Sequence, residues 1–134
     1  MKVVLDTNVF ISGIFFSGPP SNILQAWKDS KIQILLSKEI LLEYRRVAEE
    51  LSSKFPPVNI VEIIEILTIY GEIFETKNIS VAACEDPDDN KFIECAIAAN
   101  GKIIVSGDRH LLNISGFKGI SVLKPREFLD NYLK

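Results

Sequence analysis

The chain has 134 residues, of which 47% are hydrophobic and 25% are charged, so we expect a single globular domain over residues 1–134. Its formal net charge of −3 excludes a global positive field, and an RNA or DNA partner would need a local basic patch or bound cations. No run approaches the roughly 20 apolar residues of a membrane-spanning helix, so no membrane partner is expected.

Short apolar runs alternate with segments of helical spacing along the whole chain. We expect strands at 3–5, 32–36, 73–77, 102–105 and 120–123. We expect helices at 21–29, capped by Ser21, at 38–53, capped by Ser37, at 59–70, ended by Gly71, from 86 to about 100, and from Pro125, with a helical turn at 110–112. A loop is expected at 13–20 and a break at 55–57. This alternation predicts an α/β fold with a mostly parallel sheet and helices on both faces.

Two acids directly follow strands that we expect to be buried. Asp6 closes the run Lys2-Val3-Val4-Leu5, and Asp108 follows Ile103-Ile104-Val105-Ser106-Gly107. Each has a structural alternative, since Asp6 could accept hydrogen bonds from loop amides and Asp108 could cap the turn at 110–112. The carboxyl edge of an α/β sheet is also where ligands bind.

Two more acids lie on helices that we expect to face this edge. Glu43 stands near the apolar stripe of its helix, where it could equally extend its head into water. In Asp86-Pro87-Asp88-Asp89-Asn90, capping explains one or two of the three aspartates. Asp89 also heads an apolar stripe that points toward the sheet, so it is the better candidate for a site, with Asp88 second.

Convergence of these four carboxylates would require a cation, because unpaired acids within a few ångströms raise one another's pKa and cost stability. Mg²⁺ and Mn²⁺ prefer oxygen ligands. Such ions can activate a water and stabilise the charge on a phosphodiester. Bound metal would also reconcile an acidic chain with a nucleic-acid substrate.

Several segments together resemble the PIN domain family. They are Val4-Leu5-Asp6-Thr7-Asn8-Val9, Glu43, Asp89 leading into Ile93-Glu94-Cys95-Ala96, and Ser106-Gly107-Asp108. Their order and spacing are similar to those of PIN-type ribonucleases, which include the toxins of VapC-like toxin–antitoxin pairs. The resemblance spans essentially the whole chain.

The resemblance implies a three-layer, Rossmann-like sheet of order 3-2-1-4-5. It implies that Asp6, Glu43, Asp89 and Asp108 form a catalytic Mg²⁺ or Mn²⁺ site that hydrolyses RNA by metal-activated water. Asn8 and Ser106 match supporting polar positions, with Ser106 standing where many members carry Thr. Whether Asp88 or Asp89 is the ligand stays open. The family further implies a homodimer and an antitoxin partner.

Five basic residues near the acids in sequence could form a phosphate-binding rim, although scattered solvated charge is the alternative: Lys38, Arg45, Arg46, Lys91 and Arg109. We expect the single histidine, His110, to be a surface residue. Cys84 and Cys95 have no metal-site spacing, and a reducing cytoplasm is the simplest compartment for two free thiols.

Three functions compete. The first is a metal-dependent endoribonuclease. The second is a non-catalytic PIN scaffold that binds without cleaving. The third is a phosphatase with Asp6 as nucleophile, which Asn8 disfavours, because such enzymes usually carry a second Asp two residues on.

Overall fold

A computed structural model describes residues 1–55 and 58–133 of the chain. Its centre is a sheet in which five parallel strands lie in the order β3-β2-β1-β4-β5. The strands are β1 (Lys2–Leu5), β2 (Gln33–Ser37), β3 (Glu72–Phe74), β4 (Ile103–Val105) and β5 (Ser121–Leu123). The expected strand order and α/β class are therefore confirmed.

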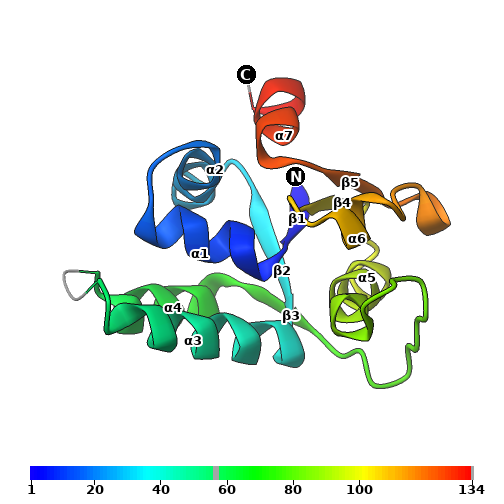
Figure 1. Ribbon diagram of the computed structural model, residues 1–134, viewed down its shortest axis with the longest axis horizontal. Helices are drawn as coiled ribbons and strands as arrows, with labels where there is room; N and C mark the ends of the chain where they lie inside the picture. The colour runs from blue at the N-terminus through cyan, green and yellow to red at the C-terminus, as the bar shows by residue number, and fades with distance from the viewer. Residues whose placement is uncertain (56–57, 134) are drawn as a thin grey trace.

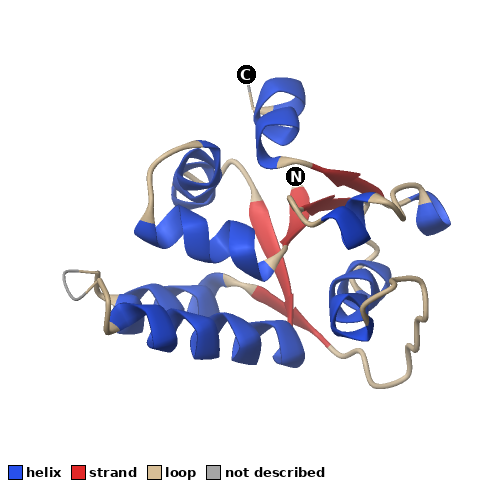
Figure 2. Ribbon diagram, viewed as in Figure 1, coloured by secondary structure: helices blue, strands red, loops and turns tan. Residues whose placement is uncertain are grey.

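Helices cover the sheet on both sides. They are α1 (Thr7–Phe15), α2 (Pro19–Lys28), α3 (Lys38–Ser52), α4 (Ile60–Tyr70), α5 (Asn90–Ala98), α6 (Arg109–Leu112) and α7 (Pro125–Tyr132), with short 3₁₀ turns η1 (Pro87–Asp89) and η2 (Phe117–Gly119). Figure 1 shows α1 to α4 on one side of the sheet and α5 and α6 on the other. In Figure 2 the strands form a single band between these helical layers. No helix in the described ranges is long and apolar enough to cross a membrane.

The central strands are buried on both faces, which explains their continuous apolar runs. Val3, Val4 and Leu5 of β1 are fully buried, as are Leu35 and Leu36 of β2. In the register, Leu5 of β1 lies opposite Val105 of β4. The residues that follow these two strands, Asp6 and Ser106, therefore emerge together at the carboxyl edge of the sheet.

The segment between β1 and β2 corrects the expected loop at 13–20. Residues 7–15 form α1, and Asp6 stands at its N-cap, where its carbonyl accepts the N–H groups of Val9 and Phe10 at 3.0 and 3.1 Å. Helix α2 begins at Pro19 rather than after Ser21, with Gly18 as N-cap at φ 121°. Prolines in the first turn are compatible with a helix, because the N–H groups they lack would have no intrahelical partner there.

Most other boundaries agree with expectation within a few residues. Ser37 caps α3 by accepting the Ile40 N–H at 3.3 Å, and Asn59 caps α4 by accepting the Glu62 N–H at 3.2 Å. The helix expected from 86 to about 100 is divided into η1 and α5, which ends at Ala98. Of the expected break at 55–57, Pro56 and Pro57 lie outside the described residues.

Candidate functional site

Asp6 is a buried acid at the end of β1, with only 5% of its surface exposed. The Ser106 hydroxyl donates to its Oδ2 at 2.6 Å. Burial raises the pKa of Asp6 and the charge of Asp108 raises it further, while hydrogen bonds from Ser106 and from the backbone of Asn8 and Thr7 offset part of the increase. Ser106 thus supports Asp6 through its side chain, whereas Asn8 contributes its backbone and has an exposed side chain.

Asp108 follows β4 and has a capping role. Its Oδ1 accepts the His110 N–H at 2.8 Å at the start of α6, as the structural alternative predicted. Its own N–H donates to the Ser106 hydroxyl at 2.9 Å. Ser106 therefore joins the two strand ends, because it donates to Asp6 and accepts from Asp108.

Asp89 brings a third carboxyl group to the same place. It is 9% exposed, and its Oδ2 has no hydrogen-bond partner among the described residues. Burial raises its pKa to about 6, with further contributions from the charges of Asp108, Asp6 and Asp86. Asp88, by contrast, is exposed, and its N–H donates to the capping Asp86 carboxylate at 3.0 Å. Of the two neighbours, Asp89 is the one that faces the strand ends.

Glu43 of α3 lies beside this cluster but already has polar partners. Its Oε1 accepts from the Lys91 ammonium at 2.7 Å, and its Oε2 accepts a short hydrogen bond from the Thr7 hydroxyl. Burial alone would raise the pKa of Glu43, but the hydrogen bonds from Lys91 and Thr7 and the Lys91 charge outweigh it, and the pKa is lowered. The structure thus brings Asp6, Asp89 and Asp108 together and pairs Glu43 separately.

The donor chemistry matches a hard divalent cation, although the acids do not form a closed cage. In residues 1–55 and 58–133, no three acidic, histidine or cysteine side chains are grouped so that they could hold a metal ion as they stand. The site nevertheless offers oxygen ligands, excess negative charge and a buried unpaired Asp89 oxygen. Mg²⁺ keeps several waters and commonly uses only one or two carboxylates, so these residues suit it without a protein cage.

Three of the five basic residues of the expected rim are paired with glutamates of the chain. Arg45 and Arg46 form ion pairs with Glu49 and Glu50 at 3.1 and 3.2 Å, on an exposed face of α3. Lys91 is paired with Glu43. Lys38 and Arg109 are exposed. For the two arginines, scattered solvated charge describes the structure better than a rim.

Sequence reasoning overlooked three contacts at this edge. Thr7 bonds Glu43, Lys91 bonds the same carboxylate, and the Tyr44 hydroxyl donates a short hydrogen bond to the Leu5 carbonyl. Only Thr7 had a local signal, since it directly follows Asp6. The others depend on how α3 packs against β1 and α5.

The charges of Asp89 and Asp108 act on Cys84, and the backbone of His110 bonds Asp108, but the side chains of His110 and the two cysteines have other surroundings. His110 is partly exposed, and its Nδ1 lies 3.2 Å from Glu85 Oε2. Cys84 and Cys95 are free, buried thiols, and burial raises the pKa of Cys95 to about 12. None of these side chains combines with the acids into a group of three that could hold a metal ion.

Comparison with known proteins identifies the family. A sequence model described as PIN domain matches residues 2–110, a span that includes every acid of the cluster. The chain belongs to the PIN domain family. PIN domains are generally nucleases.

Two further proteins resemble this PIN domain. An uncharacterized protein of Methanocaldococcus jannaschii is 31% identical over 147 aligned positions, which cover 100% of this chain and 93% of that protein. A chain in the crystal structure of VapBC2 from Rickettsia felis, bound to a DNA fragment from its promoter, is similar with a TM-score of 0.52. That match has 18% identity and covers 92% of this chain and 98% of the other, so it shows a shared fold.

Proposed function

We propose that this PIN domain is a Mg²⁺- or Mn²⁺-dependent endoribonuclease, and that it is the toxin of a toxin–antitoxin pair. The observation that carries the nuclease proposal is the cluster of Asp6, Asp89 and Asp108 at the carboxyl ends of the two central strands. Two of these acids have raised pKa values, and the buried Oδ2 of Asp89 has no hydrogen-bond partner among the described residues. Groups in this condition are characteristic of functional sites.

Each residue has a distinct part in the proposed site. Asp6, Asp89 and Asp108 would hold the cation, and Ser106 fixes the orientation of Asp6 by its 2.6 Å hydrogen bond. When bound, Mg²⁺ or Mn²⁺ supplies an activated water and neutralises charge on the phosphodiester. The capping bond from the His110 N–H holds Asp108 at the start of α6. The site is thus built on strand ends and helix caps, which are rigid positions.

Protein partners are supported by large exposed apolar side chains on α4 and β3. Val61, Ile69 and Tyr70 of α4 are 63%, 71% and 75% exposed, and Ile73 of the edge strand β3 is 50% exposed. Several large exposed apolar side chains on one helix and the strand that follows it are a feature of protein contacts. The similar fold in VapBC2 supports an antitoxin as one partner. We also propose a homodimer, which light scattering on the isolated chain would measure.

A non-catalytic scaffold is the second candidate, and one observation favours it. The described acids do not enclose a metal position, and Glu43 is already paired with Lys91. A scaffold would keep the fold and the partners without cleaving RNA. Cleavage assays separate the two functions directly.

The test is incubation of end-labelled single-stranded RNA with the protein and Mn²⁺. We expect cleavage by the wild type and a loss of at least about 100-fold in Asp6→Asn, because that change removes a carboxylate that would hold the cation, and the cation would activate water and stabilise the phosphodiester charge. Asp29→Asn makes the same chemical change at an exposed residue that ends α2, and it should cleave normally. Absence of cleavage, or equal cleavage by Asp6→Asn, would favour the scaffold. A covalent aspartyl phosphate would instead favour a phosphatase.

A further inference from the structure

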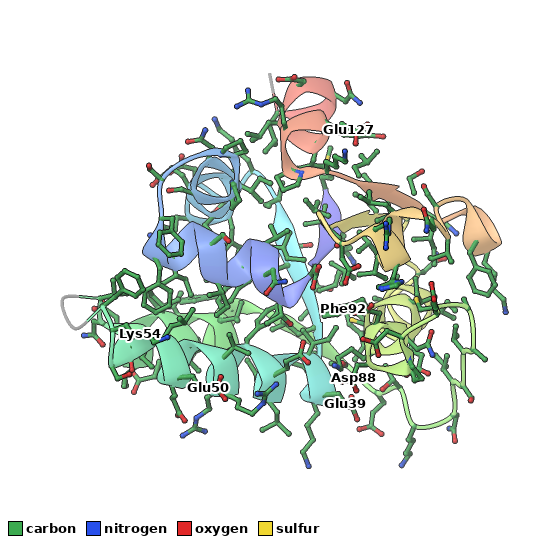
Figure 3. The ribbon with its side chains drawn as sticks, in the orientation of Figure 1. Glu39, Glu50, Lys54, Asp88, Phe92 and Glu127 are labelled. Atoms are coloured by element: carbon green, nitrogen blue, oxygen red, sulfur yellow. The ribbon has the colours of Figure 1, made fainter. Side chains whose placement is uncertain are left out.

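Lys91 of α5 makes a partly buried ion pair across two elements. Its ammonium lies 2.7 Å from Glu43 Oε1 on α3, and the two side chains are only 18% and 21% exposed. It also lies 5.5 Å from the centroid of the neighbouring Phe92 ring. Figure 3 places Asp88 and Phe92, three residues before and one residue after Lys91, beside α5. Helix α3 contacts α5 in this region.

This pair differs from the other ion pairs of α3. Arg45–Glu49 and Arg46–Glu50 join residues one helical turn apart, with side chains 58–64% exposed. Such exposed pairs contribute little, since water screens them. Lys91 and Glu43 are 48 residues apart in sequence and shielded from solvent, so removal of either charge would leave the other partly buried and unpaired.

The charges at the sheet edge are therefore divided into two groups. Glu43 has a cation from the chain itself. In contrast, Asp6, Asp89 and Asp108 form no ion pair with any lysine, arginine or histidine of residues 1–55 and 58–133. The unpartnered Asp89 oxygen belongs to this second group.

We propose that Lys91 is a fixed internal cation for Glu43, so that the acidic site takes one divalent ion, at Asp6, Asp89 and Asp108, rather than two. Glu43 is then a positioning residue that links α3, α5 and Thr7 behind the site, and not a metal ligand. Lys91 likewise neutralises a protein carboxylate instead of contacting RNA phosphate. This inference rests on the proposed metal-dependent function and specifies the metal content of that site.

The test measures Mn²⁺ stoichiometry by equilibrium dialysis and by electron paramagnetic resonance, without RNA. We expect one Mn²⁺ per chain in the wild type and in Lys91→Arg, which keeps the charge. Lys91→Met keeps the apolar stem beside Phe92 but frees Glu43, so we expect a second Mn²⁺ and a spectrum broadened by a neighbouring spin. The double variant Lys91→Met/Glu43→Gln should return to one. Lys102→Met, at an exposed lysine beside the opposite end of β4, is the matched control and should bind one.

Thermal unfolding gives a readout that does not depend on counting ions. In chelator, Lys91→Met should melt several degrees below the wild type, because Glu43 loses its partner. Mn²⁺ should raise the melting temperature of Lys91→Met more than that of the wild type. The variant is expected to bind one more ion, and each ion that binds only the folded chain adds to its stability. Circular dichroism before heating shows whether each variant is folded.

The outcomes separate this inference from the proposed function. Two Mn²⁺ in the wild type, or one in both the wild type and Lys91→Met, overturns the role of Lys91 while leaving a metal-dependent nuclease intact. No Mn²⁺ in any variant overturns both. Weaker RNA binding by Lys91→Met with unchanged Mn²⁺ stoichiometry would show that Lys91 contacts phosphate, and would also overturn it.

Discussion

The carboxyl group of Asp89 is held where its surroundings oppose its charge. It is buried, its Oδ2 has no hydrogen-bond partner among the described residues, and Asp108 and Asp6 are close enough to repel it. Capping does not explain this placement, because Asp86 already accepts the N–H of Asp88. A residue that destabilises the folded chain in this way is consistent with selection for binding a cation.

This placement predicts how stability depends on pH. The pKa of Asp89 is raised from 3.8 to about 6, so its contribution to stability is fully present below pH 4 and is lost as pH rises through 6. In chelator, we expect Asp89→Asn to be more stable than the wild type at pH 7.5, with a difference that shrinks toward pH 4. Melting temperatures between pH 4 and 8 measure this.

The exposed neighbour Asp88 provides the control for this prediction. Asp88→Asn removes the same charge one residue away, and its difference from the wild type should not follow the same pH profile. A pH-independent difference for Asp89→Asn would show that the acid does not titrate as described. Added Mn²⁺ should reverse the order at pH 7.5, because only the wild type keeps the Asp89 carboxylate for the ion.

For single residues, the sequence predicts where a side chain lies in the fold better than it predicts which side chain it bonds. Asp6 and Asp108 could be placed because parallel strands deliver their ends to one edge. The preference for Asp89 over Asp88 followed from helical spacing. The Lys91–Glu43 bond could not be foreseen, since it depends on the packing of two helices whose residues are 48 positions apart.

Among the elements, α1 and α2 approach each other closely at Gly13. A Cβ added at Gly13 would lie 2.7 Å from Leu24 Cδ1 and 2.8 Å from the Pro20 carbonyl oxygen. Both distances are below van der Waals contact, and the second involves backbone, which cannot rotate away. A side chain at position 13 would therefore push the start of α2 away from α1.

Gly13→Ala should for this reason destabilise the protein. Alanine within a helix gains about 1 kcal/mol over glycine. Overpacking against backbone typically costs about 1–3 kcal/mol, so the clash is expected to dominate. Gly107→Ala, outside any helix, is the control for the added methyl group alone, because a Cβ there meets nothing within 4 Å. Urea unfolding of both variants measures the difference, and an increase in the stability of Gly13→Ala would contradict the close contact.

The same pair of helices shows why one element escaped prediction. Residues 7–15 include Val9, Phe10, Ile11 and Ile14, whose apolar character spreads around the helix, and Gly13 weakens the helical signal further. Helix α1 forms because it is packed between α2 and α3, a tertiary effect that local propensity does not contain. The later helices had caps at Ser37, Asn59 and Asp86 that the sequence displays directly.

For the molecule as a whole, charge conflicts with the proposed substrate. The net charge is −3, and Arg45, Arg46 and Lys91 form ion pairs with glutamates of the chain itself. The strand order could be predicted from the family resemblance and is confirmed. The distribution of surface charge could not be predicted from the sequence, because it depends on which side chains form ion pairs in the folded chain.

RNA association should therefore depend on a divalent cation. We expect fluorescence anisotropy with single-stranded RNA, read before cleavage proceeds, to show weak binding in chelator. The salt dependence there should be shallow, corresponding to about one or two phosphate contacts at roughly −0.7 in log–log slope for each. Mn²⁺ should tighten binding at least about tenfold in the wild type and not in Asp6→Asn, because the ion is the main positive charge that the site can present to a phosphate. Tight binding in chelator with a steep salt slope would instead reveal a basic surface that binds RNA without metal.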